Sequence, residues 1–274
     1  MPTGCIIKGA TYLIDSTSLR LDARSAGWAR FSAQACGAKL HVIYDPDADC
    51  PVYTAFSAAR VNNITAAQAM PIVAAATYVF DLGYYDYAWW ARLDDAGCRI
   101  VTRLKTNTPL RVSATRMAAG DAILSDRVGH LPGRQASHRR NPLHQPVREL
   151  QVRIDTGRVL RIVTNDLTAP AQVIADLYKR RWAIELFFRW VKQTLKITRF
   201  LGTSENAVRI QVVIALIAFL SLRMAQTSQR AITSPLAFAR LVRDSLMHLR
   251  DLDHLEKPPP RTQTLAAHGL LFAP

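Results

Sequence analysis

Residues 77–104, TYVFDLGYYDYAWWARLDDAGCRIVTRL, decide the fold that we expect for this chain. The stretch predicts an apolar strand over 77–81 that ends in Asp81, a helix over 86–96 and a second strand over 98–104. Short runs rich in β-branched and aromatic residues indicate strands. The centre of the chain therefore alternates between strand and helix.

Three short strands are expected before this unit, at residues 11–15 (TYLID), 39–44 (KLHVIY) and 52–57 (VYTAFS). Gly, Pro and Asp residues separate them, as turns require. A helix from about Thr65 to Ala75 follows, although Pro71 interrupts its pattern. Three strands, a helix, a strand, a helix and a strand form the order of the ribonuclease H-like fold. We therefore expect an α/β protein with a ribonuclease H-like catalytic core.

The chain after residue 104 divides into three further regions. Residues 105–166 are rich in Pro, Gly and Arg and end in a predicted hairpin, 148–154 and 159–164. We expect residues 1–104 to form the first part of the core and 105–166 a β-rich insertion subdomain. Residues 167–250 then carry helices, including 206–226 and 234–249, and residues 251–274 form a tail with a triple proline.

The helix expected after Thr168, with Pro170 in its first turn, carries four polar residues on one face. Tyr178, Arg181, Glu185 and Lys192 stand at offsets of 0, 3, 7 and 14, which span an arc of about 60° on a helical wheel. The apolar residues occupy the other side. A single carboxylate in a basic, aromatic-edged stripe suggests a metal ligand that faces a polyanion. The alternative is a solvated surface with local ion pairs.

Positive charge is concentrated in two windows of the chain. The formal net charge is +14; residues 105–165 hold 11 Lys and Arg against 4 Asp and Glu, and residues 178–200 hold 7 against 1. Such clustering favours a nucleic-acid phosphate backbone as partner, with an anionic membrane as the alternative. The longest apolar run, 212–222, is shorter than the roughly 20 residues that span a bilayer, so we expect a buried helix. The cysteines show no paired spacing and indicate reduced thiols in a cytoplasmic protein.

Three acids occupy places where the expected fold carries catalytic carboxylates. Asp15 lies in the first strand, Asp81 ends the fourth and Glu185 lies on the helix after the fifth. Two Mg²⁺ ions, which prefer oxygen ligands, can be held by acids from separate elements during phosphoryl transfer. Individually, Asp15 also suits a turn and Asp81 a helix N-cap.

The chain resembles the DDE transposases of the insertion sequence 4 family in five segments. The family signature Y-x2-R-x3-E-x6-K is filled without a gap from Tyr178 to Lys192. IDSTSL from Ile14 is similar to the first-Asp motif, and FDLGYYDY from Phe80 to the second-Asp motif. KLHVIYD from Lys39 and FLGTSENAVRIQ from Phe200 are also similar. Leu82 departs from the family pattern, where Arg often follows the second Asp.

The resemblance implies a reaction, a cofactor and roles for single residues. The reaction is metal-dependent cleavage at insertion-sequence ends and strand transfer into target DNA by a homodimer on double-stranded DNA, associated with the nucleoid. It implies that two Mg²⁺ ions, which Mn²⁺ can replace, are bound by Asp15, Asp81 and Glu185. Phosphate contacts are implied for Tyr178, Arg181 and Lys192, with Trp182, Arg189 and Lys196 as weaker candidates on the same face.

Family members carry a long segment before the first catalytic strand, whereas Asp15 comes almost at once here. We therefore expect an N-terminally truncated chain, and three functions stay open. The first is a competent transposase core, favoured by the intact acids and phosphate-binding set. The second is a non-transposing DNA-binding or inhibitory remnant, and the third is a stand-alone nuclease of the same fold.

Overall fold

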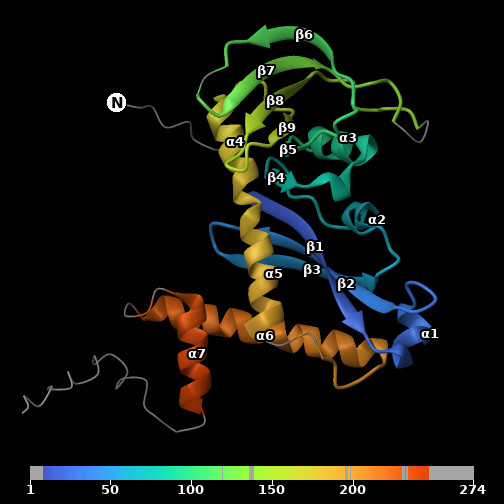
Figure 1. The fold of residues 1–274 in the computed structure, drawn as a ribbon, viewed down its shortest axis with the longest axis vertical. Coiled ribbons are helices and arrows are strands. Elements are labelled where there is room, and N and C mark those ends of the chain that lie inside the picture. The colour runs from blue at the N-terminus through green and yellow to red at the C-terminus, as the bar shows by residue number, and fades with distance from the viewer. Residues whose placement is uncertain are drawn as a thin grey trace, which may run out of the picture. The chain divides into compact units, whose positions relative to one another are not determined.

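A computed structural model describes residues 9–118, 120–135, 139–194, 197, 199–229, 232 and 234–246. The chain forms two compact units, Met1–Ile217 and Ala218–Pro274. The first unit contains a nine-stranded mixed sheet in the order β3-β2-β1-β4-β5-β9-β8-β7-β6 (Figure 1). The predicted mixed α/β fold is therefore confirmed.

The first five strands stand where the sequence predicts them. They are β1 (Thr11–Leu21), β2 (Cys36–Asp45), β3 (Cys50–Ala58), β4 (Thr77–Phe80) and β5 (Arg99–Arg103). β1, β2 and β3 pair antiparallel, whereas β4 is parallel to both β1 and β5. β1 continues six residues beyond the predicted end at Asp15, because β2 pairs with it as far as Leu21. Asp15 consequently lies inside a strand and is not a turn residue.

The region expected as an insertion continues the same sheet. It forms β6 (Arg111–Arg116), β7 (Ile123–His130), β8 (Val147–Arg153) and β9 (Val159–Thr164). β9 pairs antiparallel with β5, and β8, β7 and β6 follow outward in reverse chain order. The division of the chain at residues 104 and 166 stays a prediction, as does the tail over 251–274, which lies outside the described residues.

The central strands alternate between two buried faces. On one face, Ile14, Phe80 and Ile100 join an aromatic core with Trp89 and Trp90 of α3 (Tyr87–Asp95). α2 (Asn63–Gln68) contributes Ala67 to the same core, and it ends before Pro71, well short of the predicted Ala75. Side chains one position away from these strand residues point to the opposite face. Short helical turns η1 (Ala23–Ser25), α1 (Ala26–Ala29) and η2 (Leu82–Tyr84) lie between the strands.

Two helices, α4 (Ala171–Arg180) and α5 (Trp182–Thr194), replace the single helix that periodicity predicts. At the junction, the Arg181 amide donates to the Tyr178 carbonyl and the Ile184 amide donates to the Arg181 carbonyl, three residues back in each case. These shorter-range bonds tighten one turn and interrupt the α-helical ladder. We expect Pro170 in the first turn of this helix. In the structure it is the N-cap residue of α4, just before the first turn. In Figure 1, α4 and α5 follow one another along the sheet, and α4 contacts β5 while α5 contacts β1.

The last two helices are α6 (Glu205–Ser228) and α7 (Pro235–Leu246). The expectation of a buried helix over 212–222 is only partly correct. Val208 and Val212 are buried, but Ile210, Val213, Ile214 and Ile217 are each more than half exposed. By length and composition α6 could cross a membrane, a test that core helices of soluble proteins also pass.

Candidate active site

Asp15 and Asp81 stand side by side on neighbouring parallel strands. Ile14 pairs with Phe80 in the β1–β4 register, so the next residue on each strand is a carboxylate. Asp81 directly follows β4 and accepts a hydrogen bond from the Gly83 amide at 2.8 Å, which also caps η2. Asp15 accepts one from the Ser16 amide at 2.7 Å. Asp81 therefore fulfils the N-cap interpretation and still presents its carboxylate beside Asp15.

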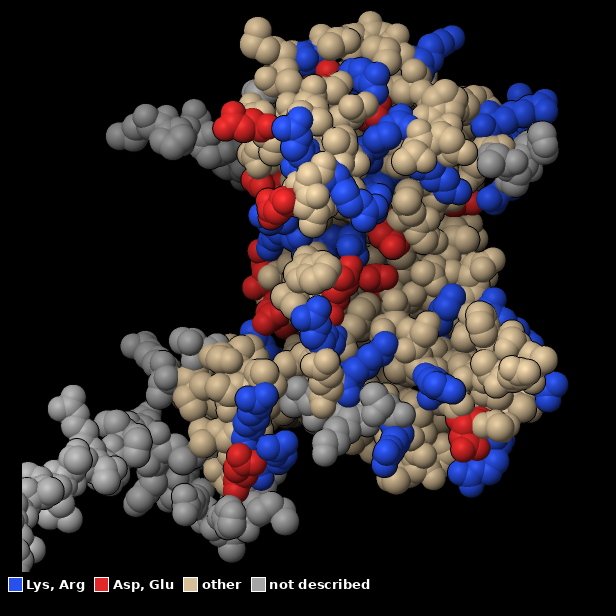
Figure 2. All heavy atoms as spheres, viewed as in Figure 1, with Lys and Arg blue, Asp and Glu red and all other residues tan. Residues whose placement is uncertain are grey.

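Glu185 of α5 is brought to this pair through Arg181. The Arg181 guanidinium contacts Glu185 Oε1 at 2.5 Å and Asp15 Oδ2 at 3.6 Å. The side chains of Asp15 and Arg181 are each 16% exposed, and that of Glu185 is 32% exposed. Figure 2 shows carboxylates gathered beside the α4–α5 junction with Lys and Arg side chains above and below them. Arg181 and Glu185 form the i, i+4 ion pair that the surface interpretation expects, but Arg181 also reaches Asp15 of β1, so this helix face contacts the sheet.

The electrostatics of the site are those of crowded carboxylates. The pKa of Asp15 is raised from 3.8 to about 6, chiefly by burial and also by the negative charges of Asp81 and Glu185. The Ser16 amide and Arg181 lower this pKa and offset part of the rise. Burial and the charges of Asp15 and Asp81 also raise the pKa of Tyr84, which lies fully buried behind them. The carboxylates repel one another, so a bound cation would stabilise the group.

Substitution of Asp15 by Asn tests this crowding through stability. Between pH 3.8 and about 6 the unfolded chain releases a proton that folded Asp15 keeps, so wild-type stability falls as the pH rises through this window. In chelator, the Asp15→Asn variant should be more stable than wild type by roughly 1–3 kcal/mol above about pH 7 and no more stable near pH 4. Urea unfolding at both pH values measures the difference. Equal stability of the two proteins above pH 7 would show that the folded protein does not raise the pKa of Asp15.

The donor set suits a hard divalent cation such as Mg²⁺ or Mn²⁺, since all three groups offer carboxylate oxygens. In the described part of the chain, no three carboxylate, histidine or cysteine groups lie close enough to enclose one ion. Arg181 joins Asp15 to Glu185 and supplies positive charge there. Arg181 therefore competes with a cation for Asp15 and Glu185.

The structure brings part of the predicted phosphate-binding set to the acids. Tyr178 is buried on α4, with the Arg181 guanidinium 5.9 Å from its ring centre. Lys192 is half-buried on α5, and burial lowers the pKa of its ammonium group. Trp182 is 50% exposed, and Arg189 lies 5.9 Å from its ring centre, so these two form a separate exposed pair. Lys196 lies outside the described residues.

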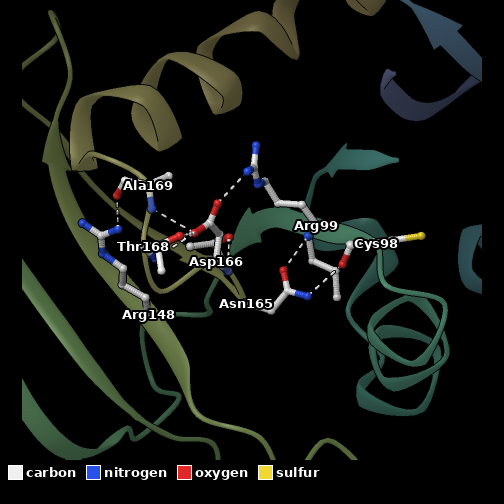
Figure 3. Close-up of polar contacts among 9 residues, drawn as sticks. Cys98, Arg99, Arg148, Asn165, Asp166, Thr168 and Ala169 are labelled. Atoms are coloured by element: carbon white, nitrogen blue, oxygen red, sulfur yellow. Dashed lines mark hydrogen bonds and ion pairs between the residues drawn. The ribbon is translucent and has the colours of Figure 1, made fainter. Parts of the chain in front are cut away.

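Polar contacts tie the segment that leads into α4 to β5 and β8 (Figure 3). Asp166, between β9 and α4, accepts hydrogen bonds from the amides of Thr168 at 2.8 Å and Ala169 at 2.9 Å. Its second oxygen pairs with Arg99 of β5 at 2.7 Å. Arg148 of β8 donates to the carbonyl of Ala169. The acidic turn therefore anchors the helix that leads to Arg181 and Glu185.

Asp166→Ala is expected to remove this anchor. Loss of two backbone caps and of the Arg99 partner should lower the free energy of unfolding by roughly 1–3 kcal/mol. Because α4 would be less firmly placed, cleavage activity should fall more than DNA affinity does. Chemical denaturation and parallel cleavage and binding assays measure these effects, and Asp176→Ala on the exposed side of α4 is the control. Unchanged stability would contradict the anchoring role.

Sequence reasoning missed Arg103 at this site. It is the last residue of β5, and the Val79–Val101 pairing places it level with Asp81 on the next strand. The only signal that could have found it is the register of β4 with β5. That register depends on pairing between strands and is not visible in a local motif.

Comparisons with known proteins agree with this architecture. The family described as Transposase DDE domain matches residues 8–220. Transposase y4zB of Sinorhizobium fredii is 40% identical over 271 residues, covering 95% of this chain and 75% of that protein. The protein named as a transposase for insertion sequence element IS5377 of Geobacillus stearothermophilus is 32% identical over 214 residues, covering 77% and 55%.

A solved structure shares the fold at low sequence identity. A chain of the piggyBac transposase synaptic complex with hairpin DNA matches with a TM-score of 0.50 and 11% identity, covering 92% of this chain and 55% of that chain. The chain thus spans about half the length of this structure and of the IS5377 relative. The relatives favour an enzyme over a DNA-binding remnant, and the chain belongs to the DDE transposase family.

Proposed function

We propose that this chain is an insertion-sequence transposase of the insertion sequence 4 type, which cleaves DNA at its element's ends and joins the freed 3′-OH to target DNA. The observation that carries the proposal is the placement of Asp15 beside Asp81, with Glu185 joined to Asp15 through Arg181. The gapless signature from Tyr178 to Lys192 supports the family assignment. The sheet order β3-β2-β1-β4-β5 supports a ribonuclease H-like core.

DDE transposases use divalent metal ions, and the oxygen donors here fit them. We assign Asp15, Asp81 and Glu185 as the ligands of two Mg²⁺ ions, which Mn²⁺ can replace. When bound, such ions activate the attacking oxygen and stabilise the leaving oxygen. The backbone elements fix the positions of the acids. Asp15 lies within β1, Asp81 directly follows β4, and α5 carries Glu185.

Tyr178, Arg181 and Lys192 are assigned to the phosphates next to the scissile bond. Arg181 can exchange its carboxylate partners for phosphate oxygens, which accept the same two-pronged hydrogen bonding. Tyr178 is a buried residue near the end of α4, and Lys192 is half-buried on α5. Trp182 and Arg189 are weaker candidates for DNA contact, together with Lys196. We place the reaction in the cytoplasm, on nucleoid DNA, with a homodimer bridging two element ends.

DNA binding through these groups should be strongly salt-dependent. Arg181→Ala and Lys192→Ala should each weaken binding to a duplex end, and the slope of log affinity against log salt should shrink by about one for each lost phosphate contact. Fluorescence anisotropy between roughly 50 and 200 mM salt measures this. The exposed Arg92 of α3 donates to the backbone carbonyl of Gln68 and lies outside the proposed set, so Arg92→Ala is the control. Affinity that does not change with salt would contradict phosphate binding.

Cleavage of a labelled duplex tests the function itself. The duplex carries the DNA that flanks the coding sequence, and the protein is supplied with Mg²⁺ or Mn²⁺. Nicking at one position that leaves a free 3′-OH and requires the metal is the expected result. Binding without any cut under these conditions would favour a DNA-binding protein over a transposase.

A further inference from the structure

Arg103 continues the row of polar residues formed by Asp15 and Asp81. The parallel register pairs Tyr78 with Ile100 and Val79 with Val101, so Asp81 and Arg103 occupy equivalent positions at the ends of β4 and β5. Side chains alternate along a strand, and Arg103 therefore shares the sheet face of Val101, opposite the face of Ile100 in the α3 core. α4 contacts β5 on the chain segment that leads to Arg181.

Arg103 differs from Arg99 and Arg181 because no described carboxylate forms an ion pair with it. Within the described ranges, no ion pair or hydrogen bond joins it to another side chain, and its Nε is buried without an acceptor. Arg99, four residues earlier on the same strand and face, pairs with Asp166 at 2.7 Å. A guanidinium nitrogen withdrawn from water without an acceptor is costly. The position of Arg103 is thus suited to an anion supplied from outside the chain.

The charge of Arg103 acts on the same group as that of Arg181. Burial raises the pKa of the Tyr178 phenol, and the charges of Arg181 and Arg103 oppose this rise. The Arg181 guanidinium lies 5.9 Å from the centre of the Tyr178 ring, and the charge of Arg103 acts on the same phenol from β5. A phosphate that binds Arg181 would have to replace the carboxylates of Asp15 and Glu185. In the described part of the chain, Arg103 has no carboxylate partner that a phosphate would have to replace.

We propose that Arg103 binds a backbone phosphate of the DNA strand beside the carboxylates, completing an anion site with Tyr178 and Arg181. The proposal rests on the DNA cleavage function proposed above and adds a residue that the signature does not contain. Two guanidinium groups and a phenol offer donors that match the non-bridging oxygens of a phosphodiester. Because β5 is a central strand, Arg103 holds this phosphate from a rigid position in the sheet.

A methylphosphonate scan tests the assignment at a single DNA position. Duplex ends that carry one neutral methylphosphonate at successive positions are bound by wild type and by Arg103→Ala. Arg103→Ala should bind the unmodified duplex roughly tenfold more weakly, and one methylphosphonate that weakens wild-type binding should leave Arg103→Ala unaffected. Arg20→Ala, exposed on β1, should keep the wild-type response at that position.

Arg103→Lys guards against a folding defect. It keeps the charge and should restore most of the salt dependence but only part of the affinity, because an ammonium group cannot bind two oxygens in the same geometry. If every methylphosphonate weakened the binding of Arg103→Ala as much as it weakens the binding of wild type, Arg103 would contact none of these phosphates. With wild-type cleavage intact, this result would overturn the Arg103 assignment alone. Absence of binding and cleavage by wild type would overturn the proposed function as well.

Discussion

Glu185→Gln should abolish metal-dependent cleavage while leaving DNA binding nearly intact. The substitution keeps the shape of the side chain but removes one of three negative charges at the site. Loss of a metal ligand removes several kcal/mol of transition-state stabilisation, so we expect at least a roughly thousandfold fall in the cleavage rate. Single-turnover cleavage of a labelled duplex end, with anisotropy for binding, measures both quantities.

Glu205→Gln is the matched control for this variant. Glu205 of α6 contacts Arg209 at 2.5 Å, four residues away, as Glu185 contacts Arg181, although the acid comes first in the Glu205 pair. It is about half exposed and belongs to a surface ion pair, which contributes little to stability. Equal cleavage by wild type and both variants would remove Glu185 from the active site. Loss of cleavage in Glu205→Gln as well would point to the helix ion pairs and not to a metal ligand.

Arg148→Met should give the largest loss of stability in the sheet. Arg148 of β8 pairs with Asp126 of β7 through two contacts, at 2.8 and 2.6 Å, and both side chains are 3% exposed. Its removal leaves the Asp126 carboxylate buried without its cation, which costs roughly 3–5 kcal/mol. Urea unfolding monitored by circular dichroism measures the change.

The double variant Asp126→Leu, Arg148→Met separates charge burial from packing. Replacement of both members of a buried ion pair by apolar residues is often close to neutral, so the double variant should regain most of the lost stability. It should not regain full cleavage activity, because Arg148 also donates to the Ala169 carbonyl at the start of α4. A double variant as unstable as Arg148→Met would contradict the view that the unpaired carboxylate is the cause.

Local sequence pattern predicted the elements of the first unit because strand composition and turn residues are local properties. The runs TYLID, KLHVIY and TYVFD became β1, β2 and β4. The roles of Asp15, Asp81 and Glu185 came from the family resemblance, and they stay proposals. Their closeness depends on the β1–β4 register and on a contact between Arg181 and Asp15 that spans most of the chain.

Other features depend on contacts that periodicity cannot represent. The break at Arg181 changes two backbone hydrogen bonds and leaves the apolar spacing of α4 and α5 unchanged. The addition of β6–β9 to the core sheet depends on the pairing of β9 with β5. The exposed apolar residues of α6 show a third case, since hydropathy predicts burial but not whether a partner surface is present.

Binding of Mn²⁺ to the complex of the protein with a duplex end tests the central claim most directly. Electron paramagnetic resonance counts the ions bound by wild type and by the triple variant Asp15→Asn, Asp81→Asn, Glu185→Gln. The account predicts that wild type binds two ions that the triple variant does not bind, with equal DNA occupancy. Equal numbers of bound ions in the two complexes would show that these three carboxylates are not the metal site.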